Sequence, residues 1–275
     1  MDLYAVIGNP VEHSRSPDIH TRFAAQTGET LRFERLLAAR DGFAATVAAF
    51  AARGGRGLSV TVPFKREAFA LAERRSTRAA LAESANLLRR EASGWWADNT
   101  DGAGLVRDIA RNAGVALAEA RVLLIGAGGA AAGSLGPLIE ARPREVVVAN
   151  RSAEKAAHLV GTHAALAATH RVALRDAPLE RCGTAFDVVI NATASSLHAS
   201  APPVSPDVLA PGCLALDMMY GPAARSFLDW ARGHGALARD GMGMLVEQAA
   251  VAFFAWRGVH PDAGAVLSAL AAETA

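Results

Sequence analysis

The apolar residues of this chain alternate between short unbroken runs and longer stretches with helical spacing. Unbroken apolar runs such as Val122–Ile125 are typical of strands buried in a parallel sheet. We predict strands at residues 4–7, 31–37, 57–62, 87–91, 95–97, 122–125, 145–149, 187–193 and 214–220. Helices are expected over residues 17–28, 42–53, 103–112, 129–139, 244–257 and 262–274, and another should start near Lys65. Strands that alternate with helices predict an α/β fold with a parallel sheet.

A glycine-rich turn follows the run Val122–Ile125. Gly126 and Gly128 lack the side chains that would keep the backbone away from a pyrophosphate, and Ala131 stands where the fingerprint G-x-G-x-x-G/A allows alanine. The helix that starts here offers unpaired N–H groups and a positive dipole end to an anion. We therefore expect a Rossmann-type unit that binds a dinucleotide.

The next predicted strand ends at Asn150-Arg151-Ser152, where such a unit meets the adenosine ribose. An NAD site would place Asp or Glu here, whereas Asn150 and Arg151 suit the 2′-phosphate of NADP. Lys155 lies one helical turn beyond Arg151 and can face the same phosphate. A hydrogen bond to a charged group contributes about 1.5 to 3 kcal/mol, so Arg151 alone could favour NADP(H) by roughly tenfold or more. The alternative is two solvated cations at a helix start.

Composition narrows the class of protein. At 275 residues with 51% hydrophobic residues, the chain can form two domains. The net charge of +1 and the absence of a long basic run give no indication of binding to nucleic acid or a membrane surface. The two cysteines, Cys182 and Cys213, lack metal-ligand spacing and are expected to be reduced core residues of a cytoplasmic protein, with no metal site. We recognise no signal peptide at the N-terminus.

Polar residues gather at the ends of several predicted strands. Ser14 and Ser16 precede Pro17, with Ser16 expected as the helix N-cap, and their hydroxyls could hold a small carboxylate; capping alone is the alternative. Lys65 follows a strand and begins a helix, an unfavourable end for a cation, so a ligand or a partner is expected there. The segment 98–102, D-N-T-D-G, suggests a site wall or a multiply capped turn.

Two dehydrogenase classes are excluded by motifs that the chain lacks. Neither Tyr4 nor Tyr220 is followed by lysine four positions later, so the Tyr-x-x-x-Lys pair of short-chain dehydrogenases is missing. The cysteine-rich ligand set of zinc alcohol dehydrogenases is missing as well. The best acid/base pair in the N-terminal half is Lys65 with Asp101.

Eight motifs, in order along nearly the whole chain, resemble the shikimate dehydrogenase family. They are G-N-P-V-E-H-S-R-S-P (8–17), V-T-V-P-F-K (60–65), D-N-T-D-G (98–102), G-A-G-G-A (126–130), N-R-S (150–152), N-A-T (191–193), D-M-M-Y (217–220) and D-G-M-G-M-L-V-E-Q-A (240–249). The resemblance implies a cytoplasmic enzyme of aromatic amino-acid biosynthesis that reversibly reduces 3-dehydroshikimate to shikimate with NADPH. It also implies a substrate-binding catalytic domain, 1–102 plus 240–275, and a Rossmann NADP-binding domain, 103–239, in a monomer or homodimer.

The resemblance also assigns roles to individual residues. Lys65 and Asp101 match the catalytic pair; Ser14, Ser16 and Tyr220 would hold the substrate carboxylate; Thr61, Asn86 and Gln248 would contact mostly its hydroxyls. The turn that binds the pyrophosphate matches Gly126, Gly128, Gly129 and Ala130. The site for the 2′-phosphate matches Asn150, Arg151 and Lys155, and the nicotinamide pocket matches Thr193, Met218 and Gly241. Without the resemblance, a glutamine such as Gln248 on an alanine-rich helix would be expected at the surface.

The chain departs from the family pattern at three positions. Ser59 replaces an expected Asn, Leu87 replaces the Thr of an Asn-Thr pair, and Lys155 stands where Arg is commoner. The first two could change recognition of the substrate hydroxyls, and the third could weaken the NADP preference. Two alternatives therefore stay open: a quinate/shikimate dehydrogenase of broader specificity, and a non-catalytic NADP-binding regulator. Retention of Lys65 and Asp101 argues against the regulator.

Overall fold

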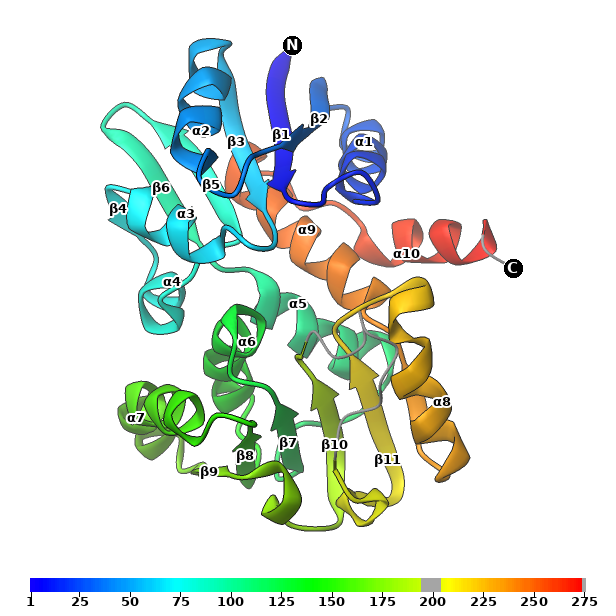
Figure 1. The fold of residues 1–275 in the computed structure, drawn as a ribbon. Coiled ribbons are helices and arrows are strands. Elements are labelled where there is room, and N and C mark those ends of the chain that lie inside the picture. The colour runs from blue at the N-terminus through cyan, green and yellow to red at the C-terminus, as the bar shows by residue number, and fades with distance from the viewer. Residues whose placement is uncertain (194–203, 274–275) are drawn as a thin grey trace. The chain divides into compact units, whose positions relative to one another are not determined.

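The computed structural model describes residues 1–193 and 204–273, which divide into two compact units (Figure 1). The first unit comprises Met1–Gly104 and Val246–Ala275, and the second comprises Leu105–Leu245. The chain passes from the first unit to the second within helix α5 (Asp101–Arg107) and returns within helix α9 (Met242–Arg257).

The first unit contains a mixed sheet with the strand order β2-β1-β3-β5-β6-β4. Strands β1 (Asp2–Gly8), β2 (Leu31–Leu37) and β3 (Gly55–Val60) are parallel, whereas β5 (Leu87–Glu91) runs antiparallel to both β3 and β6 (Gly94–Asp98). The short strand β4 (Arg74–Arg75) completes the sheet, and the helices of this unit include α1 (Ser16–Thr27), α2 (Phe43–Ala52), α3 (Lys65–Leu71), α4 (Thr77–Ala82) and α10 (Ala263–Ala272). In consequence, β1, β3 and β6 end at the edge of the sheet where β5 begins.

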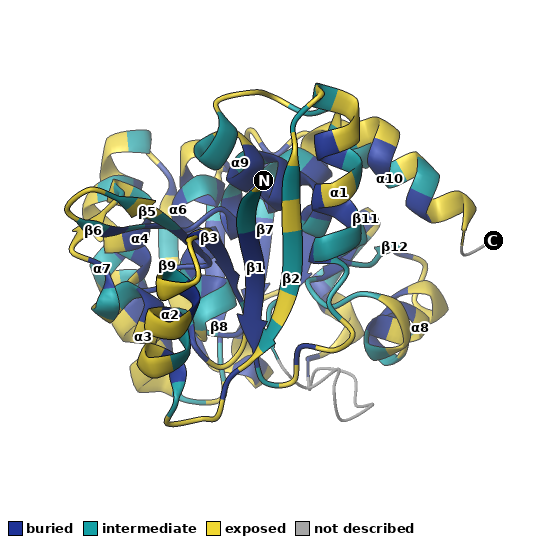
Figure 2. Cartoon of the chain, turned by 90° about the horizontal axis from the view of Figure 1, so that it is seen from above, coloured by how far each residue is buried: buried dark blue, intermediate teal, exposed yellow. Residues whose placement is uncertain are grey.

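Burial in this sheet follows the apolar pattern of the sequence. The last five residues of β1 are buried, whereas β2, an edge strand, alternates between intermediate and exposed positions (Figure 2). Helices α2 and α3 pack Phe50 and Ala68 into a core with Phe64 and Leu88. Full burial of a side chain such as Phe64 contributes about 1.5 to 3 kcal/mol.

The second unit contains a six-stranded parallel sheet with the order β12-β11-β10-β7-β8-β9. Its strands are β7 (Arg121–Ile125), β8 (Glu145–Ala149), β9 (Ala173–Ala177), β10 (Phe186–Asn191), β11 (Leu209–Asp217) and β12 (Leu237–Arg239). The main helices are α6 (Gly129–Glu140), α7 (Ala153–His170) and α8 (Arg225–Gly233). Read in chain order this is the doubly wound arrangement 3-2-1-4-5-6, whose strand order reverses between β7 and β10. The predicted Rossmann-type unit is therefore confirmed.

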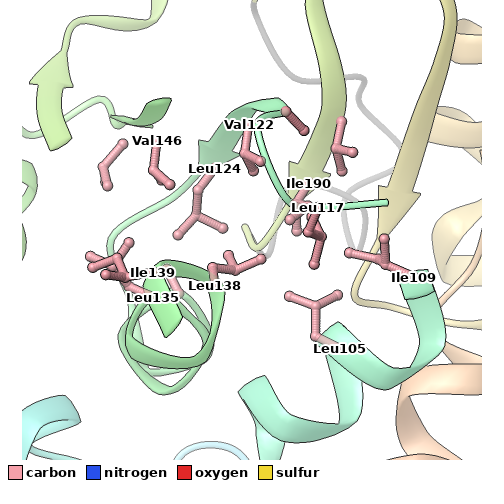
Figure 3. Packing of buried hydrophobic residues seen from close by; sticks show 14 of the residues in the cluster. Leu105, Ile109, Leu117, Val122, Leu124, Leu135, Leu138, Ile139, Val146 and Ile190 are labelled. Carbon is pink, nitrogen blue, oxygen red and sulfur yellow. The ribbon is translucent and has the colours of Figure 1, made fainter. Parts of the chain in front are cut away.

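Apolar side chains cover the two faces of this sheet in two separate clusters, one on each face. Leu105 and Ile109 pack with Leu135 and Leu138 of α6 against the strand residues Val122, Leu124, Val146 and Ile190 (Figure 3). All eight side chains are fully buried. The central strands of this sheet contain unbroken apolar runs because both faces of the sheet are covered.

Several elements differ from the prediction. The helix expected over 103–112 begins at Asp101, where the Asn99 side chain accepts a hydrogen bond from the Asp101 N–H, and its last turn is the π-helix Asp108–Asn112. The final helix ends at Ala272, and Thr274 lies outside the described residues. Elements β4, α4, β9, α8 and β12 were not predicted; the three strands among them are edge or terminal strands with few buried residues.

No helix in residues 1–193 and 204–273 is long and apolar enough to cross a membrane. In the same ranges no three or more His, Cys, Asp or Glu side chains are grouped as metal ligands would be.

Candidate active site

The catalytic pair predicted from sequence is formed in the first unit. Lys65 begins α3 after β3, Asp101 begins α5 after β6, and the Lys65 Nζ donates to Asp101 Oδ2 at 2.5 Å. The side chains are only 18% and 7% exposed, so little water screens the pair. Asn86 Nδ2 donates to the other oxygen, Asp101 Oδ1, at 2.8 Å. The lysine that the helix dipole disfavours therefore has a carboxylate partner.

A polar network surrounds this pair. The Thr100 N–H donates to Asn86 Oδ1 at 2.8 Å, and Asn86 Nδ2 lies 2.9 Å from Thr100 Oγ1 and 3.1 Å from Gln248 Oε1. Gln248 of α9 is only 9% exposed, so the expectation of a surface glutamine, which held only without the resemblance, is wrong. Thr61 follows β3 in the same sheet, and its N–H donates to the Ile7 carbonyl at 3.0 Å.

The two serines lie in the loop after β1 and at the start of α1. Ser14 Oγ accepts from the Ser16 N–H at 3.3 Å and lies 3.2 Å from Ser16 Oγ. The prediction that Ser16 caps the helix is wrong: Arg15 is the N-cap and Ser16 is the first helical residue. The physical reason is that the Ser14 hydroxyl reaches the free N–H of Ser16, which leaves the Ser16 hydroxyl close beside it.

Two of the departures from the family pattern face each other. Ser59 on β3 and Leu87 on β5 are register partners in the antiparallel ladder. Leu87 is completely buried and Ser59 is 9% exposed. Leu87 directly follows Asn86 in the chain, and the N–H of Val60, the residue after Ser59, donates to the Asn86 carbonyl at 2.7 Å, so both departures lie beside the main chain of Asn86.

The glycine turn of the second unit lies at the point where the strand order reverses. Gly126 has φ of +116°, and a Cβ there would lie 3.1 Å from the Ala192 backbone, so both conformation and packing require glycine. A Cβ on Gly128 or Gly129 would meet no atom within 4 Å. Packing within the protein therefore gives no reason for glycine at 128 and 129, whereas close approach of a pyrophosphate to the start of α6 does. Ala130 lies in the first turn of that helix.

The residues predicted to bind the 2′-phosphate follow β8. Asn150 Nδ2 donates to the Ser152 carbonyl at 2.9 Å, which shapes the turn into α7. Arg151 and Lys155 are exposed, and neither forms an ion pair within the described residues. Two cations at the positive end of a helix dipole, without a carboxylate partner, fit an anionic ligand.

The three residues predicted for the nicotinamide pocket come together at the ends of β10 and β11. Thr193 Oγ1 donates to Asn191 Oδ1 at 2.8 Å, and the Met218 N–H donates to the Asn191 carbonyl at 3.0 Å. A Cβ on Gly241 would lie 2.4 Å from the Met218 carbonyl oxygen, so the loop before α9 presses against β11. Tyr220 lies in the turn after β11, in the second unit, whereas Ser14 and Ser16 belong to the first.

The side chains that hold the segments around Asp98 and Asp108 in place were not predicted from the sequence. Asp98 accepts from Arg78 and Ser76 of the unpredicted α4 region, and Asn99 Nδ2 donates to Ser84 Oγ at 3.0 Å. In the second unit, the fully buried Asp108 accepts from Arg239 at 2.7 and 3.0 Å. The Ser-Thr pair at 76–77 was an available N-cap signal for α4.

The second unit also has a hollow away from its glycine turn. Its volume is about 400 Å³, and it is lined by Glu119, Arg142, Pro143, Arg144, Thr169, His170 and Arg171. These residues precede β7, β8 and β9, at the amino ends of the strands. Ligands of open α/β sheets bind outside the carboxyl ends, so the hollow is not the cofactor site.

Together, the doubly wound sheet with its glycine turn and the poorly exposed lysine–carboxylate pair define a dinucleotide-dependent oxidoreductase of the α/β class. Three family models cover most of the chain: the shikimate dehydrogenase substrate binding domain at residues 6–88, shikimate / quinate 5-dehydrogenase at 108–201 and the shikimate 5′-dehydrogenase C-terminal domain at 241–271. The chain belongs to the shikimate dehydrogenase family.

Named relatives agree with this assignment. The chain is 62% identical to the shikimate dehydrogenase (NADP(+)) of Methylibium petroleiphilum, over 98% of this chain and 94% of that protein. Identity to the enzyme of the same name from Acidovorax sp. (strain JS42) is 58%, over 100% and 97% of the two chains. Among solved structures, shikimate 5-dehydrogenase from Thermus thermophilus in complex with NADP(H) and shikimate is similar, with a TM-score of 0.85, 28% identity and 98% of each chain covered.

Proposed function

We propose that this protein catalyses the reversible, NADPH-dependent reduction of 3-dehydroshikimate to shikimate, in the biosynthesis of aromatic amino acids. Membership of the family and the NADP(+) in its relatives' names support the reaction and the cofactor. The observation that carries the proposal is the poorly exposed ion pair of Lys65 and Asp101. Removing two charges from water costs free energy, and an acid/base role in catalysis accounts for keeping the pair there.

The mechanism follows from the charge that develops on the substrate. NADPH, when bound, supplies a hydride to the ketone carbon. The ketone oxygen then gains negative charge, which Lys65 as an ammonium stabilises and neutralises by donating a proton from Nζ. In the reverse direction the neutral amine accepts the hydroxyl proton. Asp101 holds Lys65 through the 2.5 Å contact, and Asn86 fixes the carboxylate in turn.

We assign the substrate contacts to residues at one edge of the first sheet and in the turn after β11. Ser14, Ser16 and Tyr220 would bind the carboxylate, and Thr61, Asn86 and Gln248 the ring hydroxyls. The paired hydroxyls of Ser14 and Ser16 support the first assignment, because they can donate to an anion without a salt bridge. The network that links Asn86 and Gln248 supports the second.

NADP(H) fits the second unit. The pyrophosphate would bind at Gly126, Gly128, Gly129 and Ala130. The 2′-phosphate would bind at Asn150, Arg151 and Lys155, and the nicotinamide would lie against Thr193, Met218 and Gly241. The open space over Gly128 and Gly129 supports this assignment, as do the exposed cations after β8, which form no ion pair among the described residues.

One set of assays tests the proposal: purified protein with shikimate or quinate, each with NADP⁺ or NAD⁺. We expect a much larger kcat/KM for shikimate with NADP⁺ than for the other three pairs. A comparable rate with quinate would establish the broader alternative, which the family description shikimate / quinate 5-dehydrogenase and the Ser59–Leu87 departure favour. If no pair reduces the cofactor while NADP⁺ still binds, the protein is a regulator.

The remaining proposals concern organisation. We propose residues 1–102 plus 240–275 as the substrate-binding catalytic domain and 103–239 as the NADP-binding domain. A cytoplasmic location is proposed because Cys182 and Cys213 are free and buried. Sedimentation of the purified protein will decide between a monomer and a homodimer.

A further inference from the structure

The loop between β1 and α1 carries Ser14 and leads directly to Ser16. Its start is anchored by Asn9, whose Nδ2 donates to the Ala38 carbonyl at 2.8 Å. Within the loop, the Ser14 N–H donates to the Val11 carbonyl at 3.1 Å. These bonds fix the entry and the turn, but the orientation of Ser14 against the sheet depends on a further contact.

Arg35 on β2 makes that contact. Its Nε and Nη2 donate to the Ser14 carbonyl oxygen at 3.1 and 2.7 Å, across 21 residues of sequence. Arg35 is in register with Val6 of β1, so the strand that leads into the loop also fixes the position of the arginine. In the described ranges, two side chains from outside the loop form a hydrogen bond to residues 10–14: that of the adjacent Ser16, and that of Arg35, which alone reaches them from a strand of the sheet.

The geometry of this contact suits arginine and not lysine. Two N–H groups of one rigid planar guanidinium meet a single carbonyl oxygen, which restrains its direction as well as its distance. A lysine ammonium at the end of a flexible chain would restrain distance alone. Arg32, on the same strand, makes no such contact: it is 67% exposed and its nearest carboxylate, that of Glu34, lies at 3.5 Å.

We propose that Arg35 is a positioning residue for substrate binding. It holds Ser14 through the main chain, so that the Ser14 and Ser16 hydroxyls meet the substrate carboxylate in a fixed arrangement. The inference rests on the proposed function, because it assumes that these hydroxyls bind that carboxylate. Among the described residues Arg35 forms no hydrogen bond or ion pair with Lys65 or Asp101, so it affects binding of the substrate and not the chemical step.

Steady-state kinetics of R35M, R35K and the matched control R32M test the proposal. For R35M we expect the KM for shikimate to rise about five- to twentyfold, the range for loss of an exposed charge-assisted bond. Its kcat should stay within about twofold, with the KM for NADP⁺ unchanged. R35K should fall between wild type and R35M, and R32M should match wild type. An R35M KM within about twofold of wild type, an R35K equal to wild type, or a fall in kcat alone would overturn it.

A second measurement needs no catalysis and separates this inference from the proposed function. Amide hydrogen exchange of the free protein should be faster at residues 12–16 in R35M than in wild type, and unchanged in R32M. Unchanged exchange at these residues would refute the positioning role. An inactive wild-type protein would instead refute the proposed function, whatever the exchange result. If R35M does not fold, R35Q, which keeps a polar planar group, replaces it in both experiments.

Discussion

Acid should destabilise the first unit through one buried histidine. His20 on α1 is completely buried, and its ring stacks on Phe33 with centroids 4.4 Å apart and packs at 5.1 Å from Trp256. Neither ring nitrogen has a hydrogen-bond partner among the described residues. Burial in this apolar cluster lowers the pKa of His20 from 6.5 to about 3, because a charged imidazolium would lose its hydration without compensation.

The sign and size of the effect follow from this pKa. In the unfolded chain the ring takes up a proton near pH 6.5, whereas in the folded unit it does so only near pH 3. Its contribution to stability is therefore fully present above pH 6.5 and is lost as the pH falls toward 3. Each unit of pH in this window costs about 1.4 kcal/mol, so at pH 5 the unit should be about 2 kcal/mol less stable than at pH 8 through this residue.

Urea unfolding at pH 8, 6.5 and 5 measures this loss. In a Trp230→Phe background the remaining tryptophans, Trp95, Trp96 and Trp256, all lie in the first unit, so fluorescence follows that unit. His20→Phe keeps an aromatic ring in the stack but cannot titrate. From pH 8 to pH 5, the free energy of unfolding of the parent should fall by about 2 kcal/mol more than that of His20→Phe.

An exposed histidine serves as the control. His13→Phe replaces an exposed imidazole in the loop before α1, where no burial has to be offset, and should not reproduce the change expected for His20→Phe between pH 8 and pH 5. If the free energy of unfolding of His20→Phe follows that of its parent at every pH, then His20 has the same pKa in the folded and unfolded chains. That result would refute the proposed acid destabilisation.

Four further outcomes are expected. Lys65→Ala should lower kcat by roughly 10² to 10⁴ in an assay with shikimate and NADP⁺; unchanged kcat with a raised KM would leave Lys65 only a binding role. Arg151→Ser should reduce the ratio of kcat/KM for NADPH over NADH by about tenfold or more, and an unchanged ratio would contradict the 2′-phosphate assignment. Gly126→Ala, at φ of +116° and 3.1 Å from the Ala192 backbone, should lower stability by more than about 1 kcal/mol in thermal unfolding. Arg239→Met leaves the buried Asp108 unpaired and should cost about 3 to 5 kcal/mol by urea titration; a smaller loss than Arg232→Met on the surface would refute this.

The sequence predicted those parts of the fold that depend on local pattern. The run Val122–Ile125 predicts a strand because a buried parallel strand is apolar throughout. Gly126 predicts a turn because its positive φ favours glycine. Ser16 was misplaced by one residue, because both serines suit a cap and only the path of the loop decides which hydroxyl reaches the free N–H.

The supporting contacts of the site could not be predicted, because they join residues far apart in sequence. Gln248 meets Asn86 across 162 positions, so whether its helix face is buried depends on packing and not on the alanine-rich sequence around it. The same holds for Asp108 and Arg239, which lie 131 positions apart and carry no mutual signal. Lys65 and Asp101 were paired in advance because they are the best acid/base pair of the N-terminal half and match the catalytic pair of the family that the motifs resemble.

The glycines of the second unit fall into two kinds, with different consequences for how the protein can change. A side chain at 241 or 243 would strike the Met218 carbonyl or the Asp108 carboxylate, so changes there threaten folding itself. A methyl group at 128 or 129 would project into open space, so the polypeptide can tolerate it and still reach its native state. Under the proposed pyrophosphate assignment, binding of the cofactor is the constraint expected at 128 and 129, and alanine there should give a folded protein that binds NADP(H) weakly.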